Sequence, residues 1–125
     1  MPDVIESGRA QFAYDRAFAA SAKSYKKEYK SYSRKIPSMI AANGLAAASA
    51  FIFSEKGSGN ERAKAYDAMY TDITEALKRQ GWPINDQQLV KYLIDLDSGD
   101  YKLVTNEALA FFSRLRRFAE GLIGD

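Results

Sequence analysis

The sequence contains no cysteine and no histidine among its 125 residues. Without cysteine the chain cannot form a disulfide bond, a thiolate nucleophile or a thiolate metal site, and it suits a reducing compartment, so we expect a cytoplasmic protein. Without histidine it cannot build a Ser-His-Asp triad, and the usual zinc sites are excluded as well. Catalysis would need carboxylates, lysine, tyrosine or a hard metal ion, and no pattern of these residues predicts an enzyme. We therefore expect no catalytic residue, no metal site and no cofactor.

Strongly apolar segments are also lacking. The longest uncharged run, residues 36–54, is nearly long enough to span a bilayer. It contains Pro37, Asn43 and Gly44, and most of the rest is alanine, which drives membrane insertion far less than leucine, isoleucine or phenylalanine. The first ten residues include acidic side chains and no apolar core, so they are not typical of a secretory signal. We expect no membrane contact, and we predict that the run is a thin helix at the centre of the domain.

Helical periodicity is what the sequence does contain. Apolar side chains recur at spacings of three and four residues, and no segment keeps the alternation typical of a strand. Pro37 is expected to end the first helix, because the residue before a proline avoids the α region. Asn60 and Asp86 are candidate N-caps, and Gly81 is a candidate helix stop. The expected helices are 3–35, 37–54, 61–80, 87–96 and 100–123.

Length and composition limit the architecture. A chain of 125 residues with 46% hydrophobic residues fits one globular domain with a modest core. There is no long linker and no repeat. We predict an all-α fold, with residues 1–125 forming a single compact helical bundle of about five to six helices.

The charge is placed unevenly. The net charge is only +2, yet seven basic residues between Arg16 and Lys35 are opposed by Glu28 alone. On the expected first helix, five of these residues and Arg9 share one side, which we call the basic row: Arg9, Arg16, Lys23, Lys27, Lys30 and Arg34. Nearly opposite lies an apolar row: Phe18, Ala22, Tyr25, Tyr29, Tyr32 and Ile36. A solvated helix face usually mixes both signs of charge, so the basic row favours a polyanionic partner over a merely solvated surface.

A second basic cluster lies near the C-terminus, in the stretch RLRRF at 114–118. Arg114 and Arg117 share a helix face, whereas Arg116 is expected to point elsewhere. Arginine can fork onto a phosphate. The alternative is that these side chains offset the negative end of a helix dipole.

Two short motifs suggest ion or nucleotide sites but do not fit them. The stretch DLDSGD at 95–100 has Gly99 where a calcium loop needs an acid, and Asp100 where it needs glycine. We expect a turn followed by a helix cap. The stretch KGSGN at 56–60 follows an expected helix, lacks the GKS or GKT sequence of a P-loop and is expected to be a plain loop.

Residues 29–56, YKSYSRKIPSMIAANGLAAASAFIFSEK, resemble the signature of one family. That family is the small subunit of the type III-B CRISPR RNA-targeting complex, the Cmr complex. The matching positions are Tyr29-Lys30, Arg34-Lys35, Pro37, Ile40, Asn43-Gly44-Leu45, Phe51, Ser54 and Lys56. The stretches RAQFAYDRA at 9–17 and EALAFFSRLRRFAEGLI at 107–123 are also similar to the family.

The resemblance implies a small, all-helical, non-catalytic subunit. Its copies would associate with themselves in a head-to-tail filament, beside the other Cmr subunits that hold the guide RNA. Together they would form a channel for the guide RNA–target RNA duplex. We hypothesise that Lys23, Lys27, Lys30 and Arg34 neutralise phosphates of the target strand, independently of its sequence. The second-rank candidates for RNA binding are Arg16, Lys35, Arg114 and Arg117.

Three other functions stay open on the sequence. The first is a helical protein–protein adaptor whose basic face binds an acidic protein. The second is a DNA-binding helix-turn-helix around Pro37, although the segment after it is too apolar to read a groove. The third is a small hydrolase, which would need an acidic metal site that no pattern of carboxylates in the sequence supplies.

Overall fold

The computed structural model describes residues 4–124, with side chains described from Gly8 onward. Over this range the chain forms six helices and no strand, so the expected all-α class is confirmed. None of these helices is both long and apolar enough to traverse a bilayer. The helices are α1 (Val4–Ser21), α2 (Lys26–Asn43), α3 (Leu45–Glu55), α4 (Glu61–Arg79), α5 (Leu89–Ile94) and α6 (Ser98–Leu122).

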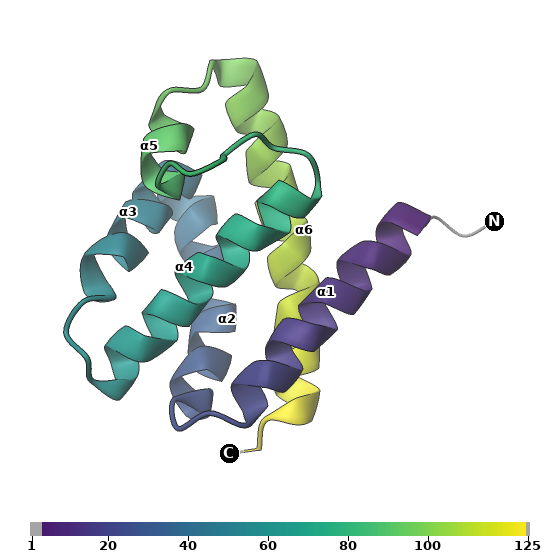
Figure 1. Ribbon diagram of the computed structural model, residues 1–125, viewed down its shortest axis with the longest axis vertical. Helices are drawn as coiled ribbons and strands as arrows, with labels where there is room; N and C mark the ends of the chain where they lie inside the picture. The colour runs from purple at the N-terminus through teal and green to yellow at the C-terminus, as the bar shows by residue number, and fades with distance from the viewer. Residues whose placement is uncertain (1–3, 125) are drawn as a thin grey trace.

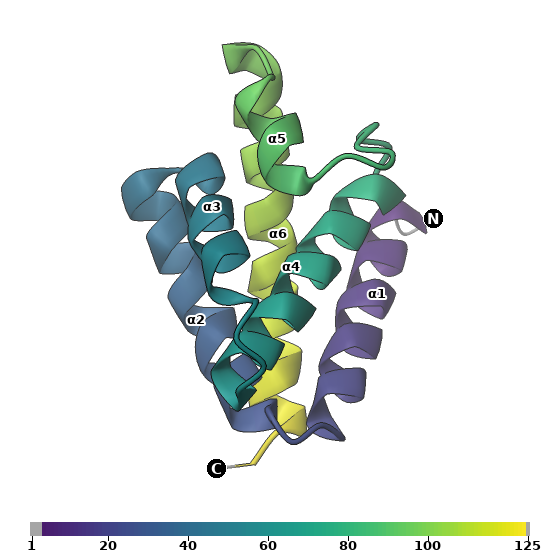
Figure 2. The same cartoon turned by 60° about the vertical axis from the view of Figure 1, so that its left-hand side comes forward.

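The long helix α6 organises the bundle. It packs against α1, α2 and α4, while α3 packs against α2, α4 and α5. Figures 1 and 2 show that α1 and α2 run in opposite directions along α6. The turn between α1 and α2 lies at one end of the molecule beside the C-terminus of α6, and α5 lies at the other end (Figure 1).

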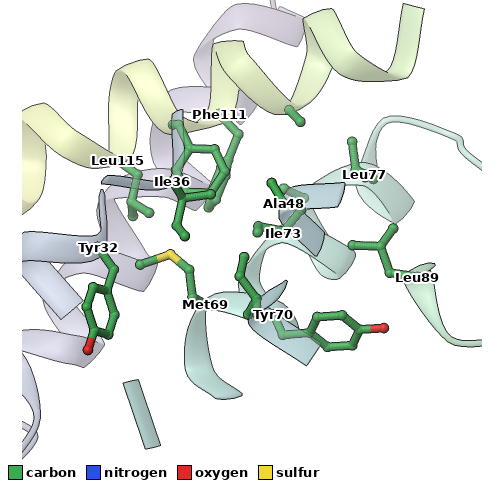
Figure 3. Packing of buried hydrophobic residues seen from close by; sticks show 14 of the residues in the cluster. Tyr32, Ile36, Ala48, Met69, Tyr70, Ile73, Leu77, Leu89, Phe111 and Leu115 are labelled. Carbon is green, nitrogen blue, oxygen red and sulfur yellow. The ribbon is translucent and has the colours of Figure 1, made fainter. Parts of the chain in front are cut away.

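One hydrophobic cluster joins the helices. Ile36 of α2, Ile73 of α4 and Leu115 of α6 are at most 1% exposed. They lie together with Met69 and Phe111 at the centre of the bundle (Figure 3). Each such side chain contributes roughly 1.5–3 kcal/mol when it leaves water, so this cluster is the main stabilising feature of the fold.

The expected helix 3–35 is wrong because the chain reverses at residues 22–25. A continuous helix could not lay both of its halves against α6. The Ser24 hydroxyl donates a hydrogen bond to Glu61 of α4 and holds the turn. The apolar row is therefore correct only in part: Tyr29 is buried as expected, whereas Phe18 on α1 is 60% exposed.

Pro37 does not end a helix, which corrects both the first expected boundary and the expected helix 37–54. It lies inside α2, which continues to Asn43. Ile36 and Ile40, on either side of the proline, are both buried, so tertiary packing outweighs the lost backbone hydrogen bond.

The break between the second and third helices falls at Gly44 instead. Its φ of 94° lies in the left-handed region that glycine adopts readily. The Tyr101 hydroxyl of α6 approaches within 3.0 Å of the position that a Cβ at residue 44 would take. The same hydroxyl accepts a hydrogen bond from the Ala46 amide at 2.9 Å, which satisfies an amide of the first turn of α3.

The expectation of a thin central helix is also wrong. Alanine-rich α3 lies at the side of the bundle, where it packs against α2, α4 and α5 (Figure 1). Ala47 and Ala50 are exposed. One face of α3 therefore carries small side chains that none of the described helices covers.

Local cap signals gave mixed results. Asn60 caps α4 as expected, because its side chain accepts a hydrogen bond from the Ala63 amide. Asp97 caps α6 through the Asp100 amide, which confirms the expected turn and cap in DLDSGD. Asp86 is not a cap, since α5 begins only after Gln88 and is shorter than the expected 87–96.

Candidate nucleic-acid interface

The basic row of the sequence is divided by the turn at residues 22–25. Its members on α1 point at acidic residues of other helices. Arg9 donates hydrogen bonds from Nε and Nη2 to the two carboxylate oxygens of Glu107 on α6, both at 2.7 Å. Arg16 donates from Nε to Asp72 on α4 at 2.8 Å. These arginines join helices to one another.

Asp72, the carboxylate that Arg16 contacts, is buried. It is 2% exposed, and its second oxygen accepts a hydrogen bond from the Tyr29 hydroxyl at 2.6 Å. Burial raises the pKa of Asp72 to about 6, although the hydrogen bond from Tyr29 and the charge of Arg16 act to lower it. Burial also raises the pKa of Tyr29 well above its ordinary value, with the charge of Asp72 as the next cause. The group thus connects α1, α2 and α4 through one carboxylate.

Lys35 lies among aromatic rings. Its Nζ donates a hydrogen bond to the Tyr66 hydroxyl at 3.0 Å. The same atom lies 5.2–5.7 Å from the ring centroids of Phe51, Tyr32 and Tyr66, which are cation–π distances. Tyr32 and Tyr66 are themselves stacked, with centroids 4.0 Å apart.

Three other basic side chains of α2 lie beside α6. Lys27, Lys30 and Arg34 border a hollow of about 270 Å³ that also includes Ser31 and Gly124. A larger hollow of about 390 Å³ is lined by Arg116, Arg117 and Glu120 of α6, with Pro37 on the α2 side. We call the five cations of these two hollows the basic face: Lys27, Lys30, Arg34, Arg116 and Arg117.

The cations of the basic face are held to different degrees. Lys30 donates to the Ile123 carbonyl at 3.0 Å, and Arg34 donates to Glu120 at 3.1 Å. The side chains of Lys27 and Arg117 are exposed and make no hydrogen bond or ion pair with another described residue. Glu120 is the one carboxylate among the described residues that line the hollows.

The structure therefore separates the RNA-binding candidates named from the sequence into two sets. Lys27, Lys30, Arg34 and Arg117 come together on the basic face, and Lys23 is exposed in the adjoining turn. The others lie outside both hollows: Arg16 contacts Asp72, Lys35 contacts aromatic rings, and Arg114 donates to the Ala110 carbonyl at 2.8 Å.

Sequence reasoning missed Arg116 and Glu120. Arg116 was expected to point away from the cluster, yet it lines the larger hollow beside Arg117. Its partner Glu120 is four residues further along α6, a spacing that places both side chains on one face. That spacing was the available signal.

Aromatic side chains are exposed on the neighbouring helix. Tyr14 is 43% exposed and Phe18 60% exposed, with nearly parallel rings whose centroids are 6.2 Å apart. The Tyr14 ring also meets the edge of Phe118 on α6 at 5.4 Å. Phe18 and Tyr14 thus form an apolar area on α1.

Carboxylates do not form a metal centre in the part of the chain that the structure describes, where no three ligand-type side chains converge. In DLDSGD, Asp95 is hydrogen-bonded by Lys91 and Asp97 caps a helix. These contacts account for two of the acids in that run.

Comparison with known proteins gives two findings. The family model described as CRISPR-associated protein (Cas_Cmr5) matches residues 5–122. The chain is also similar to a CRISPR-associated Cmr5 family protein from Thermus thermophilus, known from its X-ray crystal structure. The two sequences are 25% identical, the match covers 98% of this chain and 100% of the other, and the TM-score is 0.78. Both matches include the helices that build the basic face.

Proposed function

Because the chain belongs to the Cmr5 family, the small subunits of the type III-B CRISPR Cmr complex, we propose that its basic face binds RNA phosphates within that complex. The family resemblance seen in residues 29–56 is thereby confirmed. The protein would act in the cytoplasm as a non-catalytic subunit without a cofactor. Its ligand would be the target strand of the guide RNA–target RNA duplex.

The observation that supports this proposal is the gathering of Lys27, Lys30, Arg34, Arg116 and Arg117 around two adjoining hollows. Lysine and arginine side chains along one element match the regular negative charge of a nucleic-acid backbone. Such contacts do not read bases, so the guide RNA would supply the sequence specificity by base pairing. Each copy offers few contacts, and we expect tight binding only when several copies act together.

We also propose that copies of the chain stack head to tail, which requires two different surfaces on each copy. The two ends of the molecule differ in charge. Lys23 and Lys26 are exposed in and beside the turn between α1 and α2, and the acidic residues Asp95, Asp97 and Asp100 are exposed at the opposite end (Figure 1). These ends are complementary, which supports stacking with one end against the other.

Of the original candidates, we assign phosphate contacts to Lys23, Lys27, Lys30, Arg34 and Arg117, and we add Arg116. We assign Arg16, Lys35 and Arg114 to holding the fold, because each lies outside both hollows and is engaged by groups within the chain. Moving them to a phosphate would break those contacts.

The experiment compares two triple variants in the reconstituted Cmr complex. One changes Lys23, Lys27 and Arg117 to glutamine, because these side chains make no described contact that the fold needs. The control changes Lys64, Lys78 and Arg79 of α4 to glutamine, which removes the same charge from residues that line neither hollow and are not among those proposed for stacking. We expect the first variant alone to weaken target RNA binding by about tenfold. Its plot of log affinity against log salt should be shallower by about 0.7–0.9 for each lost phosphate contact.

Two results would contradict the proposal. Equal losses in both variants would mean that net charge matters and the basic face does not. Normal RNA affinity combined with lost incorporation into the complex would make this face a protein interface, as in the adaptor hypothesis.

A further inference from the structure

Glu120 lies at the centre of the basic face. Its Oε2 atom accepts a hydrogen bond from Nε of Arg34 at 3.1 Å and another from Nε of Arg116 at 3.2 Å. Arg34 belongs to α2, and Arg116 lies one turn earlier on α6. Guanidinium groups bind carboxylate and phosphate oxygens with the same arrangement of donors. One acidic oxygen therefore occupies the point at which two phosphate-type donors converge.

This carboxylate also lies at the boundary between the two hollows. Arg34 lines the smaller hollow, whereas Glu120 and Arg116 line the larger one. The contact between Arg34 and Glu120 therefore lies between the two hollows. If the carboxylate turned away, the cations of both hollows would border one continuous surface.

The contacts of Glu120 are weak enough to be exchanged. The side chains of Arg34, Glu120 and Arg116 are 51%, 38% and 55% exposed. Exposed ion pairs contribute little to stability, because water and salt screen them. The hydrogen bond from Arg116, with a smaller contribution from Arg34, lowers the pKa of Glu120, so the group stays charged at neutral pH.

We propose that the Glu120 carboxylate occupies a phosphate site in the unbound protein and that a phosphate of bound RNA displaces it to contact Arg34 and Arg116. This inference rests on the proposed function and makes it more specific. It gives Glu120 the role of an internal competitor for Arg34 and Arg116. Glu120 would lower the affinity of each copy, so that a single anion binds poorly and a continuous phosphate backbone binds through many copies.

The test is Glu120→Gln in the same reconstituted complex, with target RNA as the ligand. Glutamine keeps the size and an acceptor oxygen but removes the competing charge. We expect binding about two- to fivefold tighter, in line with the strength of an exposed ion pair. The salt dependence should become steeper, because more cations are then available for phosphate. Thermal melting of the isolated chain checks that the fold is unchanged.

Glu75→Gln is the matched control. Glu75 is an exposed carboxylate on α4 that pairs with Lys78 at 3.7 Å, outside both hollows. A further pair of variants carries Arg34→Gln, alone and together with Glu120→Gln. If Glu120 competes at Arg34, the gain from removing it should shrink in the Arg34→Gln background.

The outcomes separate this inference from the function on which it rests. Tighter binding by Glu120→Gln but not by Glu75→Gln supports the competitor role. Weaker binding by Arg34→Gln without a gain from Glu120→Gln would overturn it and leave RNA binding by the basic face intact. Equal gains from Glu120→Gln and Glu75→Gln would also overturn it, because net charge alone would then explain the gain. If neither Arg34→Gln nor Glu120→Gln changes RNA affinity, the proposed function fails as well.

Discussion

The arginines of α1 and the basic side chains of α2 have similar chemistry but lie in different surroundings. Arg9 and Arg16 reach across to carboxylates on α6 and α4, and the carboxylate that Arg16 meets is buried. Lys27 and Arg34 lie on an open surface beside hollows that contain one carboxylate among their described residues. The first group joins helices, and the second is exposed at the surface.

This difference shows that basic residues in a helical repeat do not identify a binding surface by themselves. What separates the two groups is how far the acidic partner is buried: Asp72 is 2% exposed and Glu107 15%, whereas Glu120, the partner of Arg34, is 38% exposed. Glu107 follows Arg9 by 98 positions and Asp72 follows Arg16 by 56, so the pairing depends on how the helices pack.

The largest expected effect concerns Asp72 and pH. Its pKa of about 6 in the folded chain exceeds the ordinary value of 3.8, so folding favours the protonated form. The contribution of Asp72 to stability is therefore full below about pH 4 and is lost as the pH rises through 6. Between pH 4 and pH 7.5, the free energy of unfolding should fall by about 2.5 kcal/mol in the wild type relative to Asp72→Asn, which cannot ionise.

Urea unfolding of both proteins across this pH range measures that difference. Other titrating groups, including Glu61 and Glu120 with their lowered pKa values, affect both proteins alike and cancel. A difference that stays constant with pH would show that the carboxyl group is not perturbed by burial.

The next effect compares the two groups of cations directly. Arg16→Gln leaves Asp72 buried without its charged partner, so we expect a loss of about 2 kcal/mol of stability at pH 7.5. That loss should shrink at pH 5, where Asp72 is protonated. Lys27→Gln removes the same charge from the basic face and should change stability by less than about 0.5 kcal/mol. Comparable losses of stability in Arg16→Gln and Lys27→Gln, measured by urea unfolding, would show that the cations of α1 and α2 do not differ in their role in folding.

The smallest effect concerns Arg9 and Glu107. Their side chains are 25% and 15% exposed, so the pair is less buried than that of Arg16 and Asp72. Its two parallel hydrogen bonds still favour a fixed geometry. We expect Arg9→Gln to cost about 1 kcal/mol in urea unfolding and to leave RNA affinity of the complex unchanged. A loss of RNA affinity without a loss of stability would instead indicate that Arg9 contacts RNA.

Signals that act within a few residues were readable from the sequence. Asn60 lies next to the helix that it caps, and Gly81 with its φ of 94° follows α4 at the expected place. The reversal at residues 22–25 contains neither glycine nor proline, and it depends on contacts such as that of Ser24 with Glu61. Pro37 was misleading because buried neighbours on both sides maintain the helix around it.

The candidate site was predictable to a similar degree. The spacing of Lys27, Lys30 and Arg34 follows from one helix, so their common surface could be expected. That α6 lies beside them, and that Arg116 and Glu120 complete the surface, depends on the packing of helices far apart in the sequence. The engagement of Arg16 by Asp72 has the same origin.

The hydroxyl of Tyr101 at the start of α3 has a consequence for cooperativity. The Ala46 amide has its acceptor on a residue 55 positions later, on α6. A peptide with the sequence of α3 lacks that acceptor, so the first turn of α3 is complete only when α6 is docked. Hydrogen exchange at Ala46 therefore reports the opening of the contact with α6 as well as fraying of α3. Through this hydrogen bond, the boundary between α2 and α3 is expected to open together with the contact to α6.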